Sequence, residues 1–403
     1  MQPIKSLQAV SDVFEISNED NYKILSFKKE INNVLVLDQG LQHTALCKSN
    51  ISKIDGENGK LFYRGIEIEK VIENNSFEDI AFELIFDKEI SLQDKTNFKN
   101  KAARYFYLSK DLKQVLDNFP ISLHPMDFLS MGVISLSALE PNEIKENNNT
   151  IDKVAYLIAQ TSVIATYYFL KSNNENWVDI GSDEPLSYQI LSHMFHNNKE
   201  YPLNEFSEIL STLLILHAEH ELNCSTTTVR NIASSGGDIY NAIACGISAF
   251  KGKLHGGASQ YVAEMYEEII VSNIKAEDYV NQKIQNKARL MGFGHRVYNC
   301  WDPRAKIMFN LLKSDNESFV SVNNYKEIML SLVKRVDNDE YFKSRSIYPN
   351  PDLLNCIFFK LLGFPSTMNT VILSLSRIAG WIAHYYEHIN DNQPIIRPRQ
   401  ISK

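Results

Sequence analysis

The chain has 403 residues, of which 44% are hydrophobic and 22% charged, as in ordinary soluble globular proteins. This length allows two domains and a large core. A net charge of −8 argues against a nucleic-acid-binding protein, although it leaves room for a local basic pocket that binds a phosphorylated ligand.

Cysteine content and the N-terminal sequence indicate which cellular location is expected for the protein. Five scattered cysteines form no CxxC pair, so neither a disulfide framework nor a cysteine zinc site is predicted, and a cytoplasmic location is expected. The first 20 residues have no apolar core and carry acidic residues early, which is typical of neither a secretory signal nor an Arg-rich transit peptide. No run of about 18 apolar residues is present, so no membrane span is predicted.

The N-terminal region differs in pattern from the rest of the chain. In residues 1–65, short β-like runs such as Val34–Leu37 and Gly59–Tyr63 alternate with polar turns. Beyond residue 66 the pattern is helical almost throughout. The predicted fold class is therefore mostly α, with a small β-rich N-terminal extension.

Two long segments illustrate the helical pattern, and two Asn-rich stretches interrupt it. Apolar residues recur at helical spacing over 261–274 and again over 366–389, so a helix is predicted in each. The stretches 142–150 and 172–184 are expected to be solvated loops.

Two histidines stand close together near the middle of the chain. If their segment is helical, His217 and His220 share one face. The pair could bind a metal ion, but HExxH is absent and no third ligand is evident. The alternatives are one histidine hydrogen-bonded inside a core, or a pair that binds a substrate anion. Polar residues at 225–228 could cap a helix or line the same cavity.

A third histidine, His255, is followed by two glycines. This pattern suits a helix boundary at which the backbone and the imidazole both face a ligand, and a simple helix connection is the alternative. Lys253 would help to keep the His255 imidazole neutral if the two side chains lie close together.

The segment 292–306 combines glycines, a histidine and an Asp-Pro-Arg turn. Glycines let the backbone approach a ligand closely, and His295 can donate a hydrogen bond or move a proton near pH 7. Arg304 offers a rigid fork that suits a carboxylate. Asp302 and Pro303 also suit the start of a helix, but a helix start does not account for His295 and Arg304 together.

The last candidate groups lie toward the C-terminus. Asn350 and Asp352 fit the cap and first turn of a helix, where Asp352 would do no more than complement the helix dipole. Arg377 falls within the apolar helix at 366–389 and needs an anionic partner from the protein or a ligand. Arg397 lies in a basic tail that could simply be solvated.

Taken together, these segments resemble the citrate synthase family of bacterial type, including the related 2-methylcitrate synthases. The similarity extends from about Leu61 to Gln400. Its landmarks, in the order and spacing of the family, are 124–126, 217–221, 254–258, 292–298, 302–304 and 380–384.

The resemblance implies a two-domain helical fold and a homodimer or higher homo-oligomer. The β-rich extension would span 1–65. The large domain would span 66–257 and 365–403, and the small domain 258–364. The active site would lie in a cleft that closes when the substrates bind.

The resemblance also implies a reaction, the condensation of acetyl-CoA with oxaloacetate followed by hydrolysis of citryl-CoA to citrate and CoA. Asp352 would take a proton from the acetyl methyl, His255 would stabilise the enol oxygen, and His295 would polarise the oxaloacetate carbonyl. The groups that would bind the substrate carboxylates are His220, Arg304, Arg377 and Arg397 of the partner subunit.

The same resemblance implies a site for the CoA phosphates, although ordinary surface charge is the alternative. The basic residues concerned are Lys287, Arg289, Arg296 and Lys306. No metal, flavin or nicotinamide motif is present, so acetyl-CoA is expected as a substrate and no cofactor is expected. Neither a nucleic acid nor a membrane is an expected partner.

The chain departs from the family beside the candidate base. Pro351–Asn355 reads Pro-Asp-Leu-Leu-Asn where the family usually has Val-Asp-Phe-Tyr-Ser, and Asn299 and Lys253 stand where Lys and Pro are usual. One interpretation is a citrate synthase with a repacked pocket. Another is a paralogue with a changed preference, such as a 2-methylcitrate synthase in which Leu353 and Leu354 loosen the wall around the acyl group.

A scaffold protein that has kept the fold is a third interpretation. The presence of Asp352, His255 and His295 together argues against it, because a binding protein has no need of a base.

Overall fold

The computed structural model describes residues 14–19, 22–27, 37–87, 91–147, 149–181, 183–313 and 317–402. The chain forms two compact units, Met1–Lys48 with Arg397–Lys403, and Ser49–Ile396. In the first unit, strands β1 (Phe14–Glu19) and β2 (Tyr22–Phe27) pair antiparallel. β structure near the N-terminus is therefore confirmed. The predicted run Val34–Leu37 lies outside the described residues, except for Leu37, which is not in a strand.

The second unit opens with a three-stranded antiparallel sheet. Its strands are β3 (Ser52–Asp55), β4 (Lys60–Tyr63) and β5 (Ile66–Glu67), in the order β3-β4-β5. β4 confirms the run predicted at Gly59–Tyr63. It buries Leu61 and Tyr63 and exposes Lys60, the alternation expected of a strand with one covered face.

The rest of the second unit is helical, which confirms the predicted fold class. The first helices are α2 (Ile68–Val71), α3 (Phe77–Phe86), α4 (Leu92–Arg104), α5 (Lys110–Asp117), α6 (Pro125–Leu139), α7 (Asn142–Asn147), α8 (Thr150–Ser172), α9 (Leu186–Met194), α10 (Leu203–His217), α11 (Cys224–Ser234) and α12 (Ile239–Phe250). Those that follow are α13 (Ala258–Ser272), α14 (Ala276–Gln285), α15 (Pro303–Leu312), η1 (Glu317–Val322), α16 (Asn323–Asp337), α17 (Glu340–Lys343), α18 (Pro351–Leu361), η2 (Ser366–Met368) and α19 (Asn369–Asn390). No described helix is long and apolar enough to cross a membrane.

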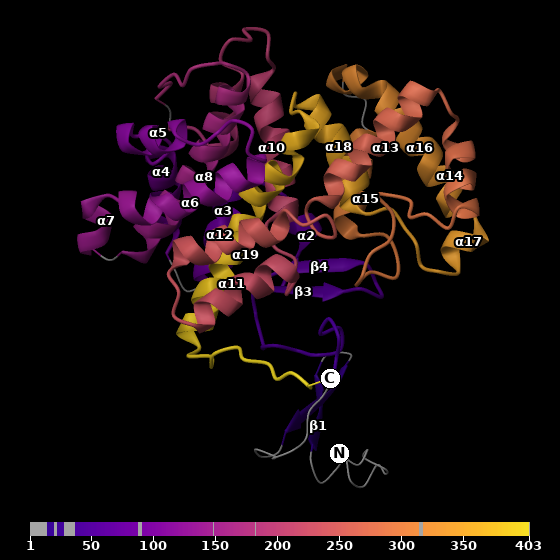
Figure 1. Cartoon of the computed structure of the whole chain (residues 1–403), viewed down its shortest axis with the longest axis horizontal. Coiled ribbons are helices and arrows are strands. Elements are labelled where there is room, and N and C mark those ends of the chain that lie inside the picture. The colour runs from indigo at the N-terminus through magenta and orange to yellow at the C-terminus, as the bar shows by residue number, and fades with distance from the viewer. Residues whose placement is uncertain are drawn as a thin grey trace. The chain divides into compact units, whose positions relative to one another are not determined.

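Helix α19 is the central element of this unit. It packs against α3, α10, α11 and α12, and nearly all of its residues as far as Tyr385 are buried. Figure 1 shows it in yellow among these helices, while α13 to α18 gather at the other side of the unit. Helix α18 packs on α13, α15 and α16. The predicted domain boundaries at 258 and 364 stay a prediction.

The two long predicted helices are confirmed, and one predicted loop is wrong. α13 buries Val262, Met265 and Ile269 on one face, as the spacing predicts. Residues 142–147 form α7 rather than a loop, because Ile144 is fully buried and anchors the turn. Asn149, which composition assigns to the same loop, caps α8 by accepting the Ile151 amide hydrogen. From residue 173 to 181 the chain is non-helical, as predicted.

Gly380 is the point of closest approach between α19 and the segment that follows α10. Its amide donates to the Ala218 carbonyl at 3.1 Å. A Cβ at Gly380 would lie 2.1 Å from Glu219 Oε2 and 2.5 Å from that carbonyl oxygen. We therefore expect Gly380→Ala to lower the free energy of unfolding by about 1–3 kcal/mol, measured by urea denaturation.

Gly246→Ala is the matched control. The three atoms nearest to a Cβ there belong to side chains, that of Val229 at 2.8 Å and that of Trp381 at 3.3 and 3.4 Å. Side chains yield more easily than backbone, so this variant should lose less stability. A loss at Gly380 no greater than at Gly246 would contradict the predicted backbone contact.

Candidate active site

His220 lies in the loop between α10 and α11, so the prediction that it shares a helix face with His217 is wrong. α10 ends at His217 because the Tyr63 hydroxyl binds the backbone amide and carbonyl that would continue the helix. This hydroxyl accepts the Glu219 amide hydrogen at 3.1 Å and donates to the Glu219 carbonyl at 3.0 Å. Glu221 then adopts a φ of +50°, and its carboxylate accepts the Ile54 amide hydrogen at 2.7 Å.

His217 is a hydrogen-bonded histidine inside the core, which was one of the alternatives for the pair. Its Nε2 lies 2.8 Å from Asn355 Oδ1. Burial, with the nearby charges of Arg304 and Arg377, lowers the pKa of His217 to about 3. The ring is therefore neutral, and its Nε2 donates to the amide oxygen.

His295 is presented by a glycine-rich loop that is tied to the start of α18. Gly292 and Gly294 have φ of +79° and +85°, which favours glycine at both positions. The Gly294 amide donates to the Tyr348 carbonyl at 2.8 Å, and the Asn350 amide donates to the Gly292 carbonyl at 3.0 Å. The loop is thereby held beside the helix that carries Asp352.

The tautomer of His295 follows from its contacts. Its Nδ1 accepts the amide hydrogens of Val297 at 2.9 Å and Tyr298 at 3.2 Å. Burial lowers the pKa of His295 to about 4, so the ring is neutral and carries its proton on Nε2. This Nε2 lies 3.8 Å from Asp302 Oδ2.

Asp302 and Arg304 form a buried, bidentate ion pair at the start of α15. Asp302 Oδ1 accepts the Arg304 backbone hydrogen at 2.9 Å, which confirms the predicted helix start. The guanidinium also donates to the two carboxylate oxygens at 3.0 and 2.7 Å. Arg304 is thus oriented by a helix cap, with part of its positive charge balanced.

His220 completes this group. Its ring centroid lies 5.3 Å from that of His295, and its Nε2 lies 3.3 Å from the Tyr298 hydroxyl. Burial, and then Arg304, His295 and Arg377, hold the pKa of His220 well below its usual value. The ring is therefore a neutral donor or acceptor in a positively charged surrounding.

Ligand atoms of His220, His295 and Asp302 lie within 4.8 Å of one another, a composition that could hold a metal ion. The charges favour an anion instead. Arg304 already occupies both oxygens of Asp302, and the guanidinium of Arg377 acts on His220 from α19. A cation would face both guanidinium groups, whereas a carboxylate would be attracted by both.

His255 lies in the turn between α12 and α13, as its glycines predict. Its Nε2 accepts the Ser225 amide hydrogen at 3.3 Å and lies 2.9 Å from the Ser225 hydroxyl. Burial and Arg377 lower the pKa of His255 to about 4, so Lys253, an exposed side chain, is not the charge that keeps this ring neutral. Nε2 also lies 3.2 Å from Asn223 Oδ1, but the Ser225 amide can only donate, which assigns the proton of the neutral ring to Nδ1.

Asp352 lies in the first turn of α18, with Asn350 as the N-cap and Pro351 at the first position, as predicted. Burial raises the pKa of Asp352 to about 6, although Arg304, the Asn355 side chain and Arg289 all oppose this shift. A carboxylate with such a pKa is ionised at pH 7 and is also a useful proton acceptor.

Arg377 is buried in α19, where an arginine needs an anionic partner. Its Nε donates to the His217 carbonyl at 2.8 Å. Burial acts to raise the pKa of Glu219, but His384, and then Arg377, hold this pKa below its usual value. His384 also holds Glu219, with Nε2 3.1 Å from Oε1. Arg377 is thus anchored at one edge by the protein and influences His217, His220 and His255 electrostatically.

The four candidate CoA-binding side chains are all exposed. Lys287, Arg289 and Arg296 lie in the segment between α14 and α15, and Lys306 lies on α15. They therefore flank His295 on both sides in the sequence. Arg397 is exposed and belongs to the first unit, and its placement at a substrate site stays a prediction.

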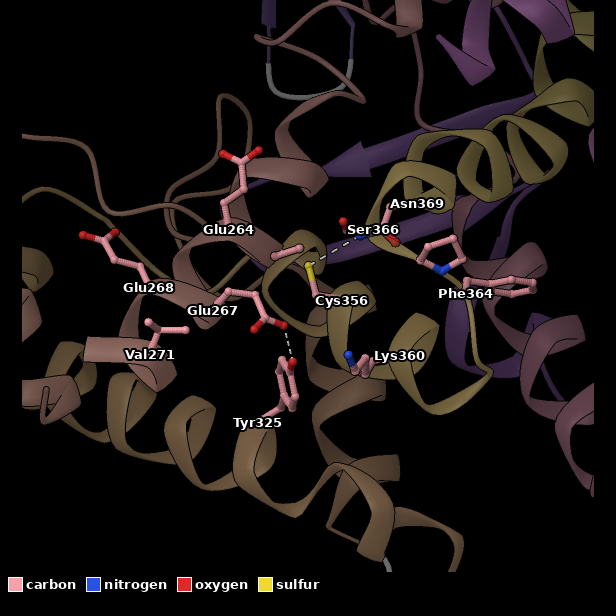
Figure 2. Close-up of a pocket in the computed structure, with 12 residues that line it drawn as sticks. Glu264, Glu267, Glu268, Val271, Tyr325, Cys356, Lys360, Phe364, Ser366 and Asn369 are labelled. Atoms are coloured by element: carbon pink, nitrogen blue, oxygen red, sulfur yellow. Dashed lines mark hydrogen bonds between the residues drawn. The ribbon is translucent and has the colours of Figure 1, made fainter. Parts of the chain in front are cut away.

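Figure 2 shows a separate pocket of about 460 Å³, lined by residues of α13, α16 and α18 and of the segment 364–369. It contains none of the predicted site residues. Glu264, Glu267 and Glu268 line one wall, and Tyr325 donates to Glu267. Three carboxylates make this pocket unsuitable for CoA phosphates. Burial raises the pKa of Cys356 in its wall, so this thiol is a poor nucleophile.

Several residues that shape the site carried no clear signal in the sequence. Ser225 was a general candidate for lining the cavity, and it contacts His255. Tyr63, Tyr298 and Asn355 reach the site from three different elements. Asn355 alone could have been singled out, because it departs from the family's usual serine.

Comparison with known proteins supports this picture. Residues 40–399 match the family described as citrate synthase, C-terminal domain. Citrate synthase 1 of Mycobacterium tuberculosis is 36% identical over 90% of this chain and 86% of its own length. A citrate synthase of Corynebacterium glutamicum is 33% identical over 97% of this chain and 91% of its own length.

Solved structures agree with the sequence relatives. Citrate synthase of Thermoplasma acidophilum, in a ternary complex with carboxymethyl coenzyme A and oxaloacetate, aligns with a TM-score of 0.81 at 27% identity, covering 91% of this chain and 96% of that one. Citrate synthase from Pyrobaculum aerophilum gives 0.80 at 29% identity, covering 96% and 94%. The chain belongs to the citrate synthase family and is an enzyme of the acyltransferase type.

Proposed function

We propose that this protein condenses acetyl-CoA with oxaloacetate and hydrolyses the resulting citryl-CoA, as a citrate synthase. The main support is that one unit contains Asp352, whose pKa is about 6, and two neutral histidines, His255 and His295. The same unit also contains two buried arginines, Arg304 and Arg377. The Thermoplasma relative binds oxaloacetate and a CoA analogue together, which supports the same pair of ligands here.

The arrangement provides the groups needed for deprotonation of a weak carbon acid. Asp352 would take a proton from the acetyl methyl while the His255 Nδ1 proton is donated to the developing enol oxygen. The His295 Nε2 proton would be donated to the oxaloacetate carbonyl, which becomes the alkoxide as the new carbon–carbon bond forms. Both histidines are neutral at pH 7, so each acts as a neutral hydrogen-bond donor through its single N–H.

Substrate binding would rest on the cationic groups around these three residues. Arg304 and Arg377 would hold the carboxylates of oxaloacetate, with His220 donating a hydrogen bond. Arg397 of the partner subunit would complete the site in a homodimer or higher homo-oligomer. The CoA phosphates would be bound by Lys287, Arg289, Arg296 and Lys306. We place the reaction in the cytoplasm, because five scattered cysteines without a CxxC pair suit a reducing compartment.

The packing of Leu353 and Leu354 adds no support for propionyl-CoA, and we propose acetyl-CoA as the substrate. The hypothesis of a loosened wall required Leu353 and Leu354 to face the acyl group. Both side chains are fully buried, and the Leu353 carbonyl accepts the Tyr266 hydroxyl hydrogen at 2.9 Å. They fill the core behind the carboxylate, and a larger acyl group gains no space from them.

The test is release of free CoA thiol by the purified protein with oxaloacetate and either thioester. We expect rapid release with acetyl-CoA, at least about 10-fold slower release with propionyl-CoA, and loss of both in Asp352→Ala. Faster release with propionyl-CoA would establish a 2-methylcitrate synthase instead. No release with either thioester would refute both functions.

A further inference from the structure

Asn355 lies between a buried histidine and the candidate base. It is three residues after Asp352 on α18, so the two side chains share a helix face. Asn355 has no exposed surface, and its Oδ1 lies 2.8 Å from His217 Nε2. The proposed mechanism gives this residue no part, and the family usually has serine at its position.

The contact with His217 fixes which way the amide points. The Asn355 oxygen faces His217, with Oδ1 2.8 Å from Nε2, and the neutral ring therefore donates its Nε2 proton to this oxygen. The amide nitrogen then points away from His217. This Nδ2 is buried and makes no hydrogen bond of ordinary length with any described residue. A buried donor left in this way carries a desolvation penalty that a nearby acceptor would relieve.

The Asp352 carboxylate lies one helical turn earlier on the same face, and a carboxylate can accept a hydrogen bond from an amide nitrogen. The Asn355 side chain already acts to lower the pKa of Asp352, as a donor to the ionised form would. The other charges that face Asp352 are Arg304 and Arg289, which also favour ionisation, and Asp302, which opposes it.

We propose that Asn355 is a positioning residue: held by His217 through its oxygen, it donates its amide hydrogen to Asp352 and holds this carboxylate in the ionised, reactive orientation. This proposal rests on the proposed function. A serine side chain is too short to contact His217 and Asp352 at the same time, so the link would be a feature of this chain.

The experiment is the pH profile of kcat/KM for acetyl-CoA in the full-length protein, from pH 5 to 9, with saturating oxaloacetate. In the unsubstituted enzyme the acid limb should fall near pH 6, where Asp352 becomes protonated. Asn355→Leu keeps the branched shape of the side chain and removes the whole amide, both the donor to Asp352 and the acceptor for His217. We expect its acid limb to move up by about 1 pH unit and its kcat at pH 7 to fall about 10-fold. KM for oxaloacetate should stay within about two-fold, because the carboxylate-binding arginines are untouched.

Asn369→Leu is the matched control. Asn369 is a buried asparagine at the start of α19 whose amide contacts Cys356 Sγ at 3.9 Å rather than the base. Its loss should leave the acid limb in place. An acid limb that is unmoved in an active Asn355→Leu enzyme, or moved equally by Asn369→Leu, would overturn the proposal.

Asn355→Ser serves if the leucine variant does not fold, since serine is the family's usual residue. It should move the acid limb in the same direction by about half a pH unit, and an unmoved limb would overturn the proposal. Absence of turnover in the unsubstituted protein is a different failure. It would refute the proposed function itself.

Discussion

Asp352→Asn is expected to reduce kcat at pH 7 by about 10³-fold or more while oxaloacetate binding stays within about two-fold. The asparagine keeps the shape of the side chain and cannot accept the methyl proton. Arg304, Arg377 and His220, which would bind oxaloacetate, are unchanged. The split between kcat and binding is measured by steady-state rates and by calorimetric titration of oxaloacetate.

The same substitution is expected to make the protein more stable at neutral pH. Burial raises the pKa of Asp352 from its unfolded value near 3.8 to about 6, so above pH 6 the folded state contains a carboxylate that would ionise more easily in water. Removing this charge should raise the free energy of unfolding at pH 7 by about 1–3 kcal/mol. Below pH 4 both states bind the proton, so the gain should disappear.

Urea denaturation at pH 7 and pH 4 tests this dependence. Asp337→Asn is a useful comparison, because Asp337 is another carboxyl whose pKa is raised by burial and lies outside the site. It should show a gain of the same sign with no loss of kcat. If Asp352→Asn were equally active, Asp352 would not be the base. If this variant were less stable at pH 7 than the unsubstituted enzyme, Asp352 would not be a destabilising buried charge.

The sequence predicted the elements whose causes are local. The Asn350-Pro351-Asp352 and Asp302-Pro303 helix starts were confirmed because a cap needs only residues within one turn. The glycines before His295 likewise adopt the positive φ that such residues allow. These two starts place Asp352 and Arg304, which are central to the candidate site.

The errors came from contacts between residues far apart in the sequence. α10 stops at His217 because Tyr63, more than 150 positions earlier, binds the backbone of Glu219, and periodicity carries no information on this contact. Burial of Leu353 and Leu354 depends on how α18 packs, which their own sequence does not show, and their predicted effect on the acyl pocket stays a prediction. The hydrogen bond between Asn355 and His217 likewise depends on the fold and cannot be predicted from the sequence pattern.

Arg304→Leu is the second substitution from which a large effect is expected, and it should affect stability and binding together. Arg304 and Asp302 are buried with 5% and 1% exposure, so removing the cation leaves an unpaired carboxylate in the core. The expected loss in the free energy of unfolding is about 3–5 kcal/mol. Oxaloacetate binding should weaken by about 2–5 kcal/mol in addition, because one carboxylate loses its clamp.

The two effects can be separated with a second substitution. In Asp302→Asn with Arg304→Leu, no buried charge is left unpaired, so most of the stability should return. Binding of oxaloacetate should not return, because the guanidinium itself is the predicted ligand. Recovery of binding along with stability would mean that Arg304 acts only through the fold. Arg304→Lys should also bind weakly, since an ammonium group retains the charge but cannot form the two parallel hydrogen bonds that the guanidinium makes.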